Sequence, residues 1–212
     1  DTGTQKWTND VVAPPIERVH SMDYASSNSL ILSVTISGFS DLVIYYLNSR
    51  QSQRITNDFY DDLDVATVNL GNRKGVVFSS NRGEADFSTQ KLDTILPIEN
   101  FDVYYFPLDR RNAKPLRLTN TPFANERNPV ALDTTYIGFL SDESGIYNQR
   151  AVYLEPYTAF YNKVYYLNDG TEILLHEDSV LVGIDSLTID SIVRVPEIKE
   201  RVIQKTLTNN VR

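Results

Sequence analysis

Short apolar runs separated by polar turn residues follow one another along most of this chain. The runs are rich in Val, Ile, Leu, Tyr and Phe and are bounded by Gly, Asn, Asp and Ser clusters, which is typical of strands joined by turns. Leu42–Leu47 and Val103–Phe106 are continuously apolar, so we expect both faces of these strands to be buried. No stretch keeps a sustained helical period, and only Glu197–Lys205 suits a helical turn or two. The pattern predicts an all-β fold.

A five-residue element recurs through the sequence. Its copies share a Thr-Asn pair and lie at Arg54–Asp58, Arg117–Thr121 and Thr206–Asn210, with a weaker one at Lys6–Asp10. We expect Thr56, Thr119 and Thr208 to occupy equivalent ends of outer strands. Recurrence of this kind is the sequence signature of a repeat architecture.

Two further elements recur in the same order. A Tyr-Tyr pair inside an apolar run occurs at Val43–Asn48, Asp102–Pro107 and Lys163–Asn168. An apolar run that ends in a polar turn occurs at Leu30–Gly38, Gly75–Gly83 and Tyr136–Gly145. Phe78 precedes Tyr104 by 26 residues, and Phe139 precedes Tyr165 by the same interval. The constant order predicts a series of repeated β units.

The stretches Ile44–Gly83 and Val103–Gly145 resemble the repeats of TolB-type β-propellers. The resemblance covers roughly residues 6–154. Similar repeats occur in the propeller of tricorn-like proteases and in large envelope proteins of Bacteroidetes-like bacteria. The resemblance implies about three four-stranded antiparallel blades, part of a larger or partial propeller, together with a β-rich insertion.

The expected blades are residues 10–58, 59–121 and 122–212, with an insertion within about 155–205. Their strands are expected at Val19–Tyr24, Leu30–Thr35, Leu42–Leu47, Gln53–Thr56, Val65–Asn69, Gly75–Ser79, Phe101–Leu108, Leu116–Thr119, Pro129–Leu132 and Tyr136–Leu140. The third strand of the last blade has two candidates, Arg150–Glu155 and Lys163–Asn168, and the other one belongs to the insertion. Asp169-Gly170 between apolar runs is a hairpin signal.

Composition and charge narrow the range of partners. The chain has 212 residues, a formal net charge of −8 and a sequence pI of about 4.8. Such a surface repels phosphate backbones, so we expect no nucleic-acid partner. No apolar run is long enough to span a membrane. The chain has no cysteine and starts at Asp1 without Met, and we expect a periplasmic or cell-envelope protein whose signal peptide has been removed.

An acidic segment, "DFYDDLD", invites a reading as a metal-binding or catalytic loop. It contains Asp58, Asp61, Asp62 and Asp64. A calcium loop of the EF-hand type needs acids at alternating positions with a central Gly, and this segment has neither. We therefore interpret these aspartates as caps of the turn between two blades.

The remaining candidates for chemistry are isolated. His20 and His176 fall at unrelated positions of their units, which indicates no metal cluster. Ser141 lies in a polar turn without a nucleophile-elbow motif. The three Tyr-Tyr pairs favour strand packing over platforms for sugars or peptides. We expect no catalytic, cofactor-binding or metal-binding residue, and no cofactor.

The function that we expect is a non-catalytic TolB-like scaffold for protein or peptide interaction in the bacterial cell envelope. Two alternatives stay open: the propeller module of a tricorn or prolyl-oligopeptidase type of peptidase, which gates peptide access, and a carbohydrate-binding propeller. Three blades do not close a ring, so apolar faces at both ends need a cover. Further blades, a homodimer that closes the propeller, or the insertion can supply it.

Overall fold

The structure is a computed structural model that describes residues 15–83, 100–109 and 113–210. These residues form β-strands and one short 3-10 helix, so the all-β prediction is confirmed, and no α-helix occurs in them. The chain divides into two compact units. The first contains Asp1–Tyr153 and Gln204–Arg212, and the second contains Leu154–Ile203. The expected repeat copy at Lys6–Asp10 lies outside the described residues.

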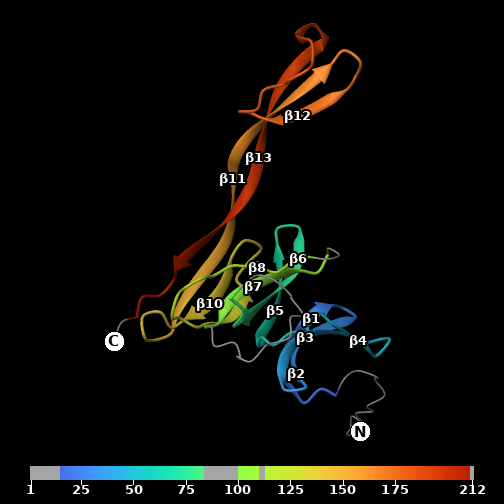
Figure 1. The fold of residues 1–212 in the computed structure, drawn as a ribbon. Helices are drawn as coiled ribbons and strands as arrows, with labels where there is room; N and C mark the ends of the chain where they lie inside the picture. The colour runs from blue at the N-terminus through green and yellow to red at the C-terminus, as the bar shows by residue number, and fades with distance from the viewer. Residues whose placement is uncertain (1–14, 84–99, 110–112, 211–212) are drawn as a thin grey trace. The chain divides into compact units, whose positions relative to one another are not determined.

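Three antiparallel sheets contain all the strands of the described residues (Figure 1). Sheet 1 consists of β1 (Arg18–Ser26), β2 (Ser29–Ile36), β3 (Phe39–Tyr46) and β4 (Gln51–Arg54). Sheet 2 consists of β5 (Asp62–Leu70), β6 (Arg73–Ser80), β7 (Asp102–Pro107) and β8 (Leu116–Arg117). Sheet 3 consists of β9 (Glu126–Ala131), β10 (Ile137–Ser141), β11 (Asn148–Leu167), β12 (Glu172–His176) and β13 (Ile189–Thr206).

Strand order follows chain order in sheets 1 and 2. Ser37 and Gly38 connect β2 to β3 with φ values of 54° and 83°. Two consecutive residues with positive φ form the turn whose twist matches that of the flanking strands. The strands expected in these two sheets all overlap observed ones. No closed ring is formed by the sheets within the described residues, so a propeller remains a proposal.

The recurring threonine holds the same place in each sheet. Its Oγ1 accepts a 2.8 Å hydrogen bond from a backbone N–H of the third strand, in the pairs Leu42 to Thr56, Val103 to Thr119 and Gln149 to Thr208. The carbonyl of the same third-strand residue accepts from the threonine N–H, at 3.4, 3.3 and 3.1 Å respectively. The repeated Thr therefore fixes the end of the fourth strand against the third.

The register of sheet 3 decides between the two candidates for its third strand. Phe78 pairs with Tyr104, and Phe139 pairs with Arg150. Tyr104 follows Val103, which binds Thr119, and Arg150 follows Gln149, which binds Thr208. Phe78 and Phe139 are therefore equivalent. Tyr165 is not the counterpart of Tyr104, and the equal interval of 26 residues is a coincidence. One long strand, β11, contains both candidate segments.

Successive sheets of the first unit contact one another through their first strands. Ser21 Oγ in β1 accepts from Val65 N in β5 at 2.8 Å, and Asp64 in β5 accepts from Asn128 N in β9 at 3.1 Å. The core between sheets 1 and 2 contains the buried residues Ala25, Ile31, Leu42, Val65, Val76, Phe78 and Tyr104. Face-to-face packing of this kind explains why these strands are apolar on both sides.

The centre of the opposite face of sheet 1 is also buried within the single chain. Its apolar side chains are Leu32, Val34, Ile36 and Val43, with exposed fractions between 0% and 8%. An open apolar face was expected at this end of the array. That expectation is wrong for the centre of sheet 1, whereas Met22 and Tyr24 of β1, which pair with Leu32 and Leu30 on this face, are each 67% exposed.

The second unit is built on the long strands β11 and β13, which run side by side (Figure 1). Beyond them, β12 pairs with β11 from Asn162 opposite His176 to Tyr166 opposite Glu172. The Asp169-Gly170 hairpin forms as predicted, with Gly170 at φ 85°. Glu197–Lys205 lies within β13, so the helical turn expected there is wrong. Pairing with β11 overrides the weak helical pattern of this segment.

Candidate functional site

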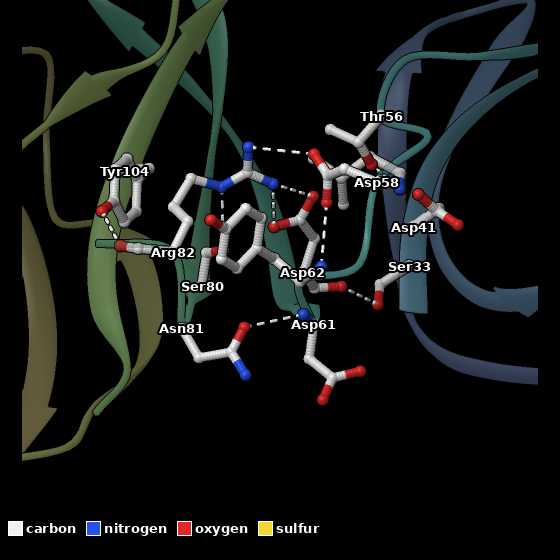
Figure 2. A network of polar contacts seen from close by, with 12 residues as sticks. Ser33, Asp41, Thr56, Asp58, Asp61, Asp62, Ser80, Asn81, Arg82 and Tyr104 are labelled. Atoms are coloured by element: carbon white, nitrogen blue, oxygen red, sulfur yellow. Dashed lines mark hydrogen bonds and ion pairs between the residues drawn. The ribbon is translucent and has the colours of Figure 1, made fainter. Parts of the chain in front are cut away.

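The acidic segment that follows β4 is part of a buried ionic cluster around Arg82 (Figure 2). Arg82 follows β6, and its side chain is fully buried. Its Nη2 donates to both carboxylate oxygens of Asp62 at 2.6 Å, and its Nε donates to Ser80 Oγ at 2.9 Å. Asp58 Oδ2 lies 3.2 Å from Nη1. The cluster therefore ties the link between sheets 1 and 2 to the strands β5 and β6.

Aromatic rings enclose the same guanidinium. The centroids of Tyr60, Phe78 and Tyr104 lie 5.3, 5.9 and 5.9 Å from Arg82 Cζ. The Tyr104 hydroxyl donates to the carbonyl of Arg82, as Figure 2 shows, and burial raises the pKa of Tyr104. A cation held over ring faces and paired with carboxylates is a packed structural centre, inaccessible to a substrate.

Carboxylates outnumber guanidinium groups in this region. Asp41 pairs with Arg54 in sheet 1, next to the Asp58, Asp62 and Arg82 group. Burial, and then the neighbouring Asp62 carboxylate, raise the pKa of Asp58 to about 6, although Arg82 opposes the shift. Burial also raises the pKa of Asp41, whose Oδ1 has no hydrogen-bond partner. Three carboxylates against two guanidinium groups leave one excess negative charge, which favours uptake of a proton.

Three aspartates of the acidic segment thus differ in their contacts. Asp58 Oδ1 accepts from Tyr60 N at 3.0 Å, which is the turn-capping role that we predicted. Asp64 instead pairs with Arg127 of β9, with Nε to Oδ2 at 2.6 Å. The ion pairs of Asp58, Asp62 and Asp64 were missed by sequence reasoning. Arg82 lies 20 positions from Asp62, and no local motif signals such a pair.

The corresponding place in sheet 3 is built differently. Glu126 pairs with Ser141 as Asp62 pairs with Ser80, but Glu143 stands where sheet 2 has Arg82. Glu126 is buried, and burial raises the pKa of its carboxyl. Its Oε1 accepts from the Thr121 hydroxyl at 2.8 Å, and its Oε2 has no hydrogen-bond partner. The arginine centre is therefore not a feature of every repeat.

The remaining candidates do not converge on a reactive arrangement. His20 Nε2 lies 2.7 Å from the Thr35 hydroxyl in the first unit, whereas His176 belongs to the second unit. Ser141 is buried, and its hydroxyl accepts from Glu143 N at 3.5 Å. Among the described residues, no group of three or more His, Cys, Asp or Glu side chains is placed to hold a metal ion.

The Tyr-Tyr pairs serve packing to different extents. Tyr104 and Tyr105 are both buried, one on each face of β7. Tyr45 and Tyr46 are half-buried in β3. Tyr165 is buried in β11 and pairs with Ile173 of β12. Strand packing, as predicted, accounts for the Tyr-Tyr pair of β7.

The second unit exposes many large apolar side chains and buries almost none. Within Leu154–Ile203, all of which the structure describes, Tyr165 is the only buried residue. Exposed large apolar side chains occur at Leu174, Val180, Val182, Leu187, Ile192, Val193, Val195 and Ile198. Val180, Val182 and Leu187 have exposed fractions of 80%, 84% and 83%. Soluble proteins rarely leave such a surface uncovered unless another molecule binds it.

Basic and aromatic side chains pair between β11 and β13 of this unit. Arg194 Cζ lies 3.6 Å from the Tyr161 ring centroid, and Lys199 Nζ lies 5.3 Å from that of Phe160. Arg201 lies over Tyr157 at 5.7 Å and pairs with Glu155 at 2.6 Å. These contacts hold the two strands together without an apolar core.

Comparison of the chain with protein-family models, with curated proteins and with solved structures gives no match. In the part of the chain that the structure describes, no helix has the length and apolar character needed to cross a membrane.

Proposed function

We propose that the chain is a non-catalytic TolB-like scaffold for protein interaction in the bacterial cell envelope, and that the second unit, Leu154–Ile203, contacts the partner. The exposed apolar surface of this unit is the observation that carries the proposal. A ribbon of the strands β11, β12 and β13 with a single buried residue gains little from its own packing. Contact with a partner would remove its apolar side chains from water and stabilise the unit.

The propeller part of the proposal rests on the repeat. Sheets 1 and 2 have four strands each in chain order, and the first strands of successive sheets lie in contact. Blades of a propeller share both properties. The threonine hydrogen bond, present at Thr56, Thr119 and Thr208, supports the equivalence of the three sheets.

The non-catalytic part of the proposal rests on the burial of the polar side chains in the Arg82 cluster. Arg82, Asp58 and Asp62 are buried and engaged with one another. We expect purified protein to show no turnover of peptide, ester or glycoside substrates. Turnover that disappears in Ser141→Ala or His176→Ala would contradict this part of the proposal.

Site-specific photocrosslinking in native cells tests the binding surface. A photoreactive phenylalanine analogue replaces Val182 in the second unit or, as a matched control, Tyr24 in β1, which is also exposed. We expect a discrete crosslinked protein from position 182 and none from position 24. Adducts from position 24 alone, or equal adducts from both positions, would place the binding surface elsewhere.

A further inference from the structure

We infer that the outward face of sheet 3 is a self-association surface on which a second copy of this chain docks. The face is defined by Asn128, Val130, Leu132, Leu140, Gln149 and Leu207. This inference goes beyond the proposed function, because it concerns the first unit and a different partner.

The corresponding face of sheet 2 is covered by sheet 3, the next sheet along the chain. Val130 pairs with Gly138, and both line one hollow on the outward face together with Leu132. Register makes Leu132 the counterpart of Val68: Val68 pairs with Gly75, and Leu132 N donates to Tyr136 O. Val68 is 2% exposed, whereas Leu132 is 52% exposed. Leu132 is therefore an apolar side chain at a position where, unlike Val68, it is not covered by a following sheet of the described residues.

The uncovered side chains surround a hollow. Its volume is about 140 Å³, and Val130 and Leu207, with exposed fractions of 47% and 51%, flank it together with Leu132. Gly138 forms part of its floor, because a Cβ there would come within 2.9 Å of Leu132. A hollow lined by branched apolar side chains suits apolar side chains from another sheet face.

The centre of the face that could accept this surface head to tail is already buried. Leu32, Val34 and Ile36 on the far face of sheet 1 are buried within the single chain. A second copy therefore offers on this face only the edge strand β1, where Met22 and Tyr24, the partners of Leu32 and Leu30, are each 67% exposed. The face of sheet 3 can instead meet its own counterpart across a two-fold axis, which ends the assembly at a dimer.

Charge and hydrogen bonding suit this self-pairing. The chain carries a net charge of −8, so most of its surface repels another copy. The open face has Arg150 as its one ionisable lining residue, and Arg150 is paired with Glu143. Asn128 stands where β5 has Asp64, and both have positive φ, at 53° and 56°. A side-chain amide can donate to and accept from its own copy, which two carboxylates cannot do.

Sedimentation velocity of the full chain from about 1 to 100 µM tests the inference. We expect a concentration-dependent dimer that Leu132→Asp or Val130→Asp weakens at least about tenfold, since each buries a charge in the interface. Ile198→Asp, a matched change on the exposed surface of the second unit, should leave the dimer intact. Circular dichroism checks that each variant is folded.

The wild-type chain contains no cysteine, which allows a second readout that needs no destabilising charge. A bis-maleimide should join two copies of Leu132→Cys and leave Ile198→Cys uncoupled. A monomer throughout the concentration range would overturn the inference. A dimer that Ile198→Asp dissociates while Leu132→Asp does not would also overturn it, and would assign self-association to the second unit.

Discussion

The backbone N–H of Val103 donates a 2.8 Å hydrogen bond to the hydroxyl of Thr119, and both residues are buried. The same relationship links Leu42 with Thr56 and Gln149 with Thr208. In the first two sheets an Asp–Arg pair accompanies it, Asp41 with Arg54 and Asp102 with Arg117. In sheet 3 the corresponding residues are Asn148 and Thr206, so both charges are replaced together.

Removing the Thr119 hydroxyl should therefore destabilise the first unit. Thr119→Val keeps the shape of the side chain but leaves the Val103 N–H buried without an acceptor, which costs about 1–3 kcal/mol. Thr119→Ser keeps the acceptor and should cost less. Urea denaturation of the two variants measures the difference. Equal stability of Thr119→Val and wild type would show that the hydrogen bond is not a structural element of the repeat.

Among the charged residues of the first unit, we expect substitution of Arg82 to lower the free energy of unfolding most. Arg82→Met removes the cation and leaves Asp58 and Asp62 buried without it, which costs about 3–5 kcal/mol. Arg127→Met is a matched control, because the Arg127–Asp64 pair is part-exposed and such pairs contribute about 1 kcal/mol or less. Thermal unfolding of both variants gives the comparison. A larger loss for Arg127→Met than for Arg82→Met would contradict the role assigned to the cluster.

The raised pKa of Asp58, about 6 against an ordinary value of 3.8, predicts an unusual pH dependence. Because the folded state binds this proton more tightly than the unfolded state, stability should rise as pH falls from 7 towards 4, by at most about 3 kcal/mol. The raised pKa values of Asp41 and Glu126 act in the same direction.

Asp58→Asn isolates this contribution, since its side-chain oxygen can still accept from Tyr60 N. Its unfolding free energy should change less between pH 7 and pH 4 than that of the wild type, and urea titrations at the two values measure this. Asp23 and Asp64, whose pKa values are lowered, begin to lose their contribution as the unfolded chain takes up protons below about pH 5, so they oppose the rise only at the lower end of this window. An unchanged slope in Asp58→Asn would disprove the assignment.

The first unit should fold without the second. Replacing Leu154–Ile203 by Asn-Gly keeps the Gln149–Thr208 hydrogen bond and removes a segment with one buried residue. We expect the melting temperature of the shortened chain to fall by only a few degrees. Loss of cooperative unfolding would show instead that the first unit depends on the second.

Most of the strand predictions followed from local sequence patterns. Turn residues and apolar runs placed the strands of sheets 1 and 2, and the repeated Thr marked equivalent hydrogen bonds because both partners belong to every repeat. The third strand of sheet 3 stayed undecided, since β11 runs through both candidates. β13 was mistaken in part for a helix, because its partner lies far away in sequence. The Arg82 cluster was missed for the same reason.

Hydrogen exchange with mass spectrometry tests the central claim, that the second unit is the binding surface of a structural scaffold, most directly. It is measured on the purified chain alone and with the protein captured by crosslinking at Val182. Amides of Ile189–Thr206 should exchange fast in the free chain and slowly in the complex, while those of Leu42 and Val103 stay unchanged. Protection confined to sheets 1 and 2, with β13 unaffected, would contradict the claim.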